Sequence, residues 1–259
     1  MLYLTFSITT VSMIRSIFII LFYYSFCIQP LFAQAITQVH FQYHAVTAAQ
    51  KDSTVQQWLQ PYTDSLNHYL NSVIGFSLEN VYKKKGGGPL GNFITAAMLQ
   101  QALLQTATKI DAAFLHPAGI KGFLPQGNIT IGTLYALLPY TNRLVVQQIS
   151  GAILEEFVHR MAADGGWLST GINYAIDVYG KAKNIRIQQQ PILPNAVYHI
   201  VVSDYMANGG SNCSMLRSLP SIPLHTTLIE TCKNYIQSFT NNHEPITVNK
   251  AAQFTNIYE

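Results

Sequence analysis

Hydrophobic positions recur along the chain in two periods, and together they predict amphipathic helices mixed with short strands. Apolar residues at helical spacing (i, i+3, i+4, i+7) predict helices over 61–73, 92–106, 130–138, 150–161 and 227–239. Alternating or short apolar runs predict strands over 39–46, 111–115, 143–149, 173–179, 185–187 and 198–203. No internal repeat or long linker divides this series. The pattern predicts an α+β fold, a single domain of mixed β-sheets layered with helices.

Glycine, proline and capping residues predict where these elements begin and end. Pro61 predicts a break near Gln60, with the helix proper starting at Pro61 or Tyr62, and Gly75 predicts its stop. Asn92 and Ser150 are predicted helix N-caps. The stretch 83–89, three lysines followed by three glycines and a proline, predicts a loop.

The first 35 residues differ in character from the rest of the chain. Arg15 is the one charged residue among them, and the apolar run 16–28 that follows is shorter than the roughly 20 residues of a membrane span. This arrangement predicts a signal peptide over 1–35 and a mature domain over 36–259, exported to the periplasm or outside the cell, with no stable membrane span after cleavage. An uncleaved anchor that includes residues 2–12 is the alternative, and Met13 is an alternative start.

Composition narrows the class of protein and its partners. The 259 residues are 49% hydrophobic, 12% aromatic and 10% charged, which excludes an intrinsically disordered chain. The net charge of +3 is too small and too dispersed for a nucleic-acid partner. After removal of the leader, Cys213 and Cys232 remain, and a disulfide between them is left open.

Motifs for autonomous catalysis are absent from the sequence. It contains no Gly-x-Ser-x-Gly elbow, no phosphate-binding loop of the Gly-x-x-x-x-Gly-Lys-Ser/Thr type, and no Asp-x-His or His-x-His pair for a two-metal centre. Glu155 and Glu156 are adjacent and point different ways, so a solvated helix face is expected there. We therefore expect no catalytic residue, no metal ligand and no cofactor in this chain.

Several short loop motifs nevertheless follow one another in a fixed order. They are Gly91-Asn92-Phe93, Gly119-Ile120-Lys121, Gly127-Asn128-Ile129-Thr130, Pro139-Tyr140-Thr141-Asn142, Ser150-Gly151 and Asn208-Gly209-Gly210-Ser211. In order and spacing the set resembles the C-terminal domain of 5'-nucleotidases and covers nearly all of the mature chain. The resemblance implies that family's fold.

The resemblance also implies a binding site. In the family two aromatic side chains sandwich the base, and Tyr140 and Tyr205 match them here. Lys121 matches an arginine that reaches the phosphate, and Asn142 matches a polar residue beside the base. The remaining substrate-binding positions implied by the motifs are His116, Asn92, Gly119 and Ser211.

Five positions depart from the family pattern. His116 and Pro117 stand where asparagine and a small residue are usual, Ser211 replaces an aspartate expected to bind ribose hydroxyls, and Ala96 replaces another aspartate. Lysine at position 121 keeps the positive charge but lacks the two-pronged geometry of arginine. These changes concern the ligand rather than the fold.

In the family, this domain recognises the nucleotide while a separate metallophosphatase domain cleaves the phosphate. The resemblance therefore implies a nucleotide or nucleoside ligand and a separate metallophosphatase subunit, with divalent metals bound by that subunit alone. Two alternatives remain open: an interaction or scaffold module with a degenerate pocket, and an autonomous phosphoester hydrolase.

Overall fold

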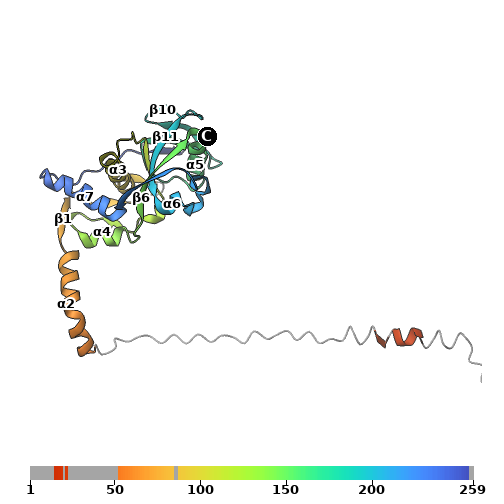
Figure 1. The fold of residues 1–259 in the computed structure, drawn as a ribbon, viewed down its shortest axis with the longest axis horizontal. Helices are drawn as coiled ribbons and strands as arrows, with labels where there is room; N and C mark the ends of the chain where they lie inside the picture. The colour runs from red at the N-terminus through yellow and green to blue at the C-terminus, as the bar shows by residue number, and fades with distance from the viewer. Residues whose placement is uncertain (1–14, 20, 23–51, 85–86, 257–259) are drawn as a thin grey trace, which may run out of the picture. The chain divides into compact units, whose positions relative to one another are not determined.

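The computed structural model describes residues 15–19, 21–22, 52–84 and 87–256. The chain divides into two compact units, 1–52 and 53–259. In the first unit residues 15–19 and 21–22 are helical. The strand predicted over 39–46 and most of the predicted leader lie outside the described residues, so both stay predictions. The second unit contains all the elements described below (Figure 1).

A five-stranded sheet in the order β12-β6-β11-β3-β7 forms the centre of the second unit. Its strands are β3 (Ala112–Leu115), β6 (Arg143–Ser150), β7 (Leu168–Thr170), β11 (Val197–Ser203) and β12 (Ser221–Thr227). β11 runs parallel to β3 and antiparallel to β6. The strands predicted over 111–115, 143–149 and 198–203 are thereby confirmed.

Helices cover both faces of this sheet (Figure 1). The helices of this unit are α2 (Ser53–Leu70), which buries none of its residues, α3 (Gly88–Gln105), α4 (Ile131–Leu137), α5 (Gly151–Ala163), α6 (Asp204–Ala207) and α7 (Leu228–Asn241), with 3-10 turns η1 (Pro117–Gly119), η2 (Gly210–Asn212) and η3 (Ser214–Leu216). Side chains alternate across a strand, so Ala113 and Leu115 of β3 join the core with α3 and α7, whereas Ala112 and Phe114 join the core with α5. The sheet therefore separates two hydrophobic cores.

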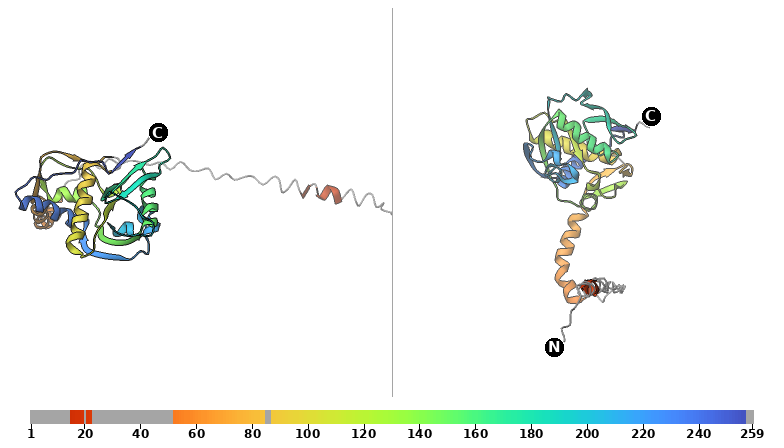
Figure 2. Two further views of the ribbon diagram at one scale, coloured as in Figure 1. Left: turned by 90° about the horizontal axis from the view of Figure 1, so that it is seen from above. Right: turned by 90° about the vertical axis from the view of Figure 1, so that its right-hand side faces the viewer.

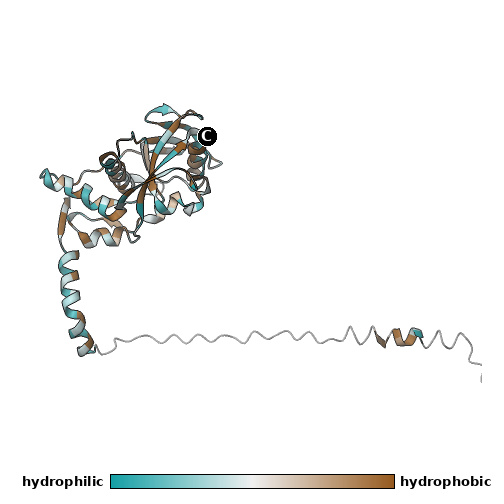
Figure 3. Ribbon diagram, in the orientation of Figure 1, coloured by the Kyte–Doolittle hydropathy of each residue, from teal (hydrophilic) through white to brown (hydrophobic). Residues whose placement is uncertain are grey.

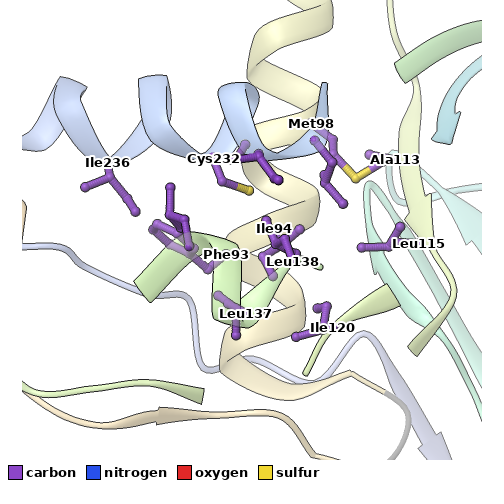
Figure 4. Close-up of a cluster of buried hydrophobic side chains, with 14 of the residues drawn as sticks. Phe93, Ile94, Met98, Ala113, Leu115, Ile120, Leu137, Leu138, Cys232 and Ile236 are labelled. Carbon is purple, nitrogen blue, oxygen red and sulfur yellow. The ribbon is translucent and has the colours of Figure 1, made fainter. Parts of the chain in front are cut away.

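The first core lies between the sheet and helices α3, α4 and α7 (Figure 4). Ile94 and Met98 of α3, Leu138 after α4 and Ile236 of α7 are all fully buried in it. α3 is apolar on all sides, and nine of its residues are buried. Burial of this kind stabilises the scaffold by roughly 1.5–3 kcal/mol for each large side chain.

The second core is closed by a further sheet and by aromatic packing around α5. Its four strands, in the order β10-β9-β8-β13, are β8 (Ile172–Ile176), β9 (Ala182–Ile187), β10 (Gln190–Pro191) and β13 (Phe254–Asn256). Phe157 packs edge-on against both Phe114 and Trp167, with ring centroids 5.2 and 5.8 Å away. Two small sheets complete the unit: β1 (Val73–Ser77) with β5 (Gly127–Thr130), and β2 (Val81–Tyr82) with β4 (Phe123–Leu124). Figure 2 shows these layers from two further directions.

The structure confirms the predicted fold class and corrects several predicted boundaries. No break occurs at Pro61, which lies inside the continuous helix α2. Because proline has no N–H, Pro61 cannot donate a hydrogen bond to the Gln57 carbonyl one turn earlier in the helix. Gln57 is exposed, so water can donate to that carbonyl instead. Gly75 does not end this helix either, because it lies within β1.

Asn92 is not the N-cap of α3. The helix begins at Gly88 with Gly87 as its N-cap and Pro89 in its first turn, where the missing proline N–H costs nothing. Ser150, in contrast, is confirmed as the N-cap of α5, since its hydroxyl accepts a hydrogen bond from the Ile153 N–H.

Cys213 and Cys232 are both free and both buried. Cys232 of α7 belongs to the first core and Cys213 to the second, so the central sheet lies between them. The disulfide left open by the sequence is therefore not formed.

No helix among the described residues is both long and apolar enough to cross a membrane.

Candidate functional site

Three strand ends meet at one edge of the central sheet. β3 and β11 are parallel neighbours, so their carboxyl ends lie at the same edge, and the antiparallel β6 begins there, with Leu144 opposite Ser203. The segments that continue from these ends are the η1 loop (116–121) after β3, the segment 139–142 before β6, and α6 with the glycine turn after β11. Three motifs far apart in sequence are thereby brought together.

These segments enclose a cavity of about 350 Å³. Leu115 and Met206, both fully buried, contribute apolar wall. The full lining is Leu115, His116, Ala118, Gly119, Tyr140, Asn142, Ser203, Tyr205, Met206 and Ser211. Six of the eight residues predicted from the motifs therefore line one cavity: Tyr140, Tyr205, Asn142, His116, Gly119 and Ser211.

Tyr205 is held in place from several sides although its side chain is 55% exposed. It lies in the first turn of α6, where the Asp204 carboxylate accepts a hydrogen bond from the Tyr205 N–H at 2.8 Å. The phenol oxygen accepts a hydrogen bond from the Ser211 N–H at 3.3 Å. A Cβ built on Gly210 would lie 2.5–2.6 Å from three carbons at the hydroxyl end of the ring, so Gly210 rests on one ring face. This glycine leaves the other face available to the cavity.

Tyr140 and Asn142 reach the cavity from the segment between α4 and β6. The Tyr140 side chain is 48% exposed. The Asn142 carbonyl accepts a hydrogen bond from the Leu228 N–H at 2.9 Å, which ties the segment to the start of α7. Within the part of the chain that the structure describes, the Asn142 carboxamide has no hydrogen-bond partner, so its donor and acceptor are free for a ligand.

His116 contributes a neutral imidazole to the cavity wall. Its Nδ1 accepts a hydrogen bond from the Ala118 N–H at 3.1 Å, and its ring packs edge-on against Trp167 at 4.6 Å. Burial lowers the pKa of His116 from 6.5; Arg160 and Lys83 lower it further, whereas Asp164 raises it. Because Nδ1 is an acceptor, Nε2 carries the proton of the neutral ring and can donate a hydrogen bond.

Lys83 stabilises the η1 loop through hydrogen bonds to two of its carbonyls, a role that the sequence did not indicate. Its ammonium group donates to the carbonyls of Pro117 at 3.1 Å and Ile120 at 3.0 Å. In the sequence Lys83 begins a lysine and glycine run that is typical of a solvated loop, and no pattern there connects it with residues more than thirty positions away.

A second, more open hollow of about 520 Å³ shares Asn142 and Tyr205 with the first. Arg217 lines it, and its Nε donates to the Asn208 carbonyl at 3.3 Å. Arg217 also escaped sequence reasoning, because it lies beyond the last motif.

Two predicted residues do not line the cavity. Asn92 is buried, and its amide donates to the carbonyls of Asn249 and Ala251 at 2.9 and 2.8 Å, so it fastens the C-terminal segment to α3. Lys121 is exposed at the end of the η1 loop, and its backbone N–H donates to the Leu137 carbonyl at 2.8 Å.

The donor set of the described residues does not suit a metal ion. Among them, no three His, Cys, Asp or Glu side chains gather closely enough to hold one.

Comparison with known proteins connects this geometry to a family. Residues 66–218 match the family model described as "5'-nucleotidase, C-terminal domain". Among curated proteins, the chain is 28% identical over 209 residues to Endonuclease YhcR of Bacillus subtilis, covering 77% of this chain and 16% of that protein. It is 26% identical over 163 residues to Protein UshA of Yersinia enterocolitica, covering 61% of this chain and 28% of that protein.

A solved structure shares the fold. The 5'-nucleotidase precursor from Thermus thermophilus superposes with a TM-score of 0.68 at 20% identity, over 82% of this chain and 44% of that one. The chain thus spans less than half the length of each of these proteins.

Proposed function

The chain belongs to the family of 5'-nucleotidase C-terminal domains, and from that premise we propose that it recognises a nucleotide or nucleoside. In this proposal the planar base lies between Tyr140 and Tyr205. Cleavage of the phosphate would be performed by a metallophosphatase carried on a separate chain, which also binds the divalent metals.

One observation carries this proposal: two half-exposed tyrosines from separate segments line the same cavity. Each base that stacks on an aromatic ring gains roughly 1–3 kcal/mol. A phenol ring stacks in the same way as a phenyl ring. The cavity volume of about 350 Å³ is within the range of small-molecule sites.

Polar groups around the rings suit a nucleoside. The Asn142 carboxamide can both donate a hydrogen bond to the edge of a base and accept one from it. The His116 Nε2–H can donate a hydrogen bond to a sugar or phosphate oxygen. The Ser211 hydroxyl replaces a carboxylate, so sugar recognition should be weaker than in the family pattern.

Lys121 is the residue proposed to contact the phosphate, because it occupies the position of the arginine in the family motif. Lys121 is the exposed last residue of the η1 loop, and this loop lines the cavity through Ala118 and Gly119. A lysine acts on phosphate as a point charge. Binding through it should weaken with added salt.

Export is part of the proposal. Arg15 followed by the apolar run 16–28 supports secretion, so the nucleotide would be met in the periplasm or outside the cell.

Calorimetric titration of AMP, adenosine and UMP onto the exported chain tests the proposal. We expect binding of at least one ligand and a loss of about tenfold or more in affinity in Tyr140→Ala and in Tyr205→Ala. Tyr179→Ala is the matched control, because Tyr179 is 84% exposed and lies outside the cavity.

Two outcomes would favour the alternatives. Absence of binding by all three ligands would leave a scaffold module with a degenerate pocket. Metal-dependent phosphate release by the purified chain, abolished by a chelator, would establish an autonomous hydrolase. It would overturn the proposal that a separate metallophosphatase chain cleaves the phosphate.

A further inference from the structure

Helix α2 carries apolar side chains on its surface and buries none of its residues. Beyond its first turn, five large side chains are exposed by 44–76%: Trp58, Leu59, Tyr62, Leu66 and Tyr69. We call these five the α2 stripe. A helix in a monomeric protein normally turns such residues into its own core. An exposed apolar patch of this size marks an interaction surface.

The spacing of the stripe is that of a two-helix seam. Leu59, Tyr62, Leu66 and Tyr69 follow one another at intervals of three, four and three residues. This 3-4-3 repeat keeps the side chains on a line that a second helix can follow along its whole length. Trp58 lies directly beside the line, whereas Pro61 lies away from it and does not obstruct it.

The rest of the fold meets α2 at its C-terminal end. α2 contacts α4 there, and the Leu70 carbonyl lies against Gly132 of α4. The Ser72 carbonyl then accepts a hydrogen bond from the Ile131 N–H at 3.1 Å. Within the described part of the chain, Trp58, Leu59 and Leu66 stay exposed by more than half. Figure 3 shows hydrophilic and hydrophobic residues interspersed along the α2 ribbon.

The scarcity of charged residues on α2 favours a second copy of this chain as its partner. Asp64 is the one charged residue between Ser53 and Leu70, and it lies five positions after Leu59, on the side opposite the stripe. No like charges would face each other across a pair of these helices. No charged residue flanks the stripe to select a partner of opposite charge.

The area is sufficient for a small specific interface. Each large aromatic side chain can bury about 150–250 Å² in full, so five half-exposed side chains offer on the order of 500 Å² per copy. Two copies would bury roughly 1,000 Å² in total, at the lower limit for specific association.

We propose that two copies of this chain associate through their α2 stripes into a symmetric two-helix seam. Each copy presents the same surface to the other, as a two-fold interface requires. The proposal goes beyond nucleotide recognition and does not depend on it, because none of the stripe residues lines the cavity.

Sedimentation equilibrium of the exported chain over a range of concentrations tests this proposal. We expect twice the mass of one chain at high concentration. The double variant Leu59→Glu/Leu66→Glu should place four carboxylates in the seam and weaken the dimer by at least tenfold. The matched control is Leu103→Glu/Leu104→Glu, since these two leucines of α3 are also exposed, by 52% and 74%, and lie outside the stripe.

Each outcome of this experiment either supports the proposed dimer or overturns it. A dimer that is lost in the α2 variant and kept in the control supports the proposal. A monomer at every concentration, a dimer that persists in the α2 variant, or association with a different protein alone would overturn it. Circular dichroism confirms that the variants stay folded, which we expect because both substituted positions are exposed.

Discussion

At the scale of single residues, the position of Tyr205 depends on Gly210. A glycine here lets the backbone approach one ring face so closely that any side chain would displace the ring. The sequence shows the Gly-Gly pair but does not show which ring it supports, because that contact arises only when the chain turns back after α6.

Gly210→Ala tests this dependence. The added methyl group would lie about 2.5 Å from the Tyr205 ring carbons, so the ring must move out of its stacking position. We expect nucleotide affinity to fall about tenfold or more, measured by calorimetric titration. Tyr205→Phe keeps the ring and should retain most of the affinity. Unchanged affinity in Gly210→Ala would show that the Tyr205 ring does not hold the base.

The lowered pKa of His116 predicts a pH-dependent stability. Well above pH 6.5 the ring is neutral in both the folded and the unfolded chain, so it contributes no pH dependence there. As the pH falls below 6.5, the unfolded chain takes up a proton that the folded chain resists, and stability decreases towards the lower folded pKa.

His116→Asn is the variant that isolates this effect. Asparagine can still accept the Ala118 N–H but does not titrate. We expect the loss of melting temperature between about pH 7 and pH 5 to be smaller in His116→Asn than in the unaltered chain. Equal losses in both proteins would mean that His116 has an ordinary pKa.

At the scale of elements, the strands that position the site were among those that the sequence predicted, as were β8 and β9. β3, β6 and β11 are continuous apolar or alternating runs, because central strands are covered on both faces. β2, β4 and β10 have two residues each, too few for any period to be visible. β1, β5, β7, β12 and β13 also escaped prediction. Their pairing is decided by contacts with distant segments.

Pro61 shows a further limit of local patterns. The residues around it have helical spacing, yet a proline argues for a break. The helix continues because its surroundings are water, which satisfies the one carbonyl left without a donor. The outcome depends on exposure, which the sequence alone does not give.

The η1 loop depends on Lys83 in a way that can be measured. Lys83→Met removes the ammonium that bridges the Pro117 and Ile120 carbonyls. Because this contact is partly solvated, we expect a cost of about 1 kcal/mol. Faster amide exchange over residues 116–121 would detect the loosened loop. Lys84→Met is the matched control, and equal exchange in the two variants would contradict the role assigned to Lys83.

At the scale of the whole molecule, the central sheet connects the scaffold to the site. The two cores fix the sheet from both faces, and the loops at one sheet edge supply the cavity lining. Family motifs in the sequence were sufficient to indicate six of these lining residues. They misplaced Asn92 because a Gly-Asn pair also serves to fasten the C-terminal segment, and nothing local distinguishes the two roles.

A crystal structure of the chain soaked with a nucleoside monophosphate tests the central claim most directly. We predict electron density for the base between the Tyr140 and Tyr205 rings, with the Asn142 carboxamide at the base edge. Density for the base at another place, or an empty cavity at saturating nucleotide, would contradict the account.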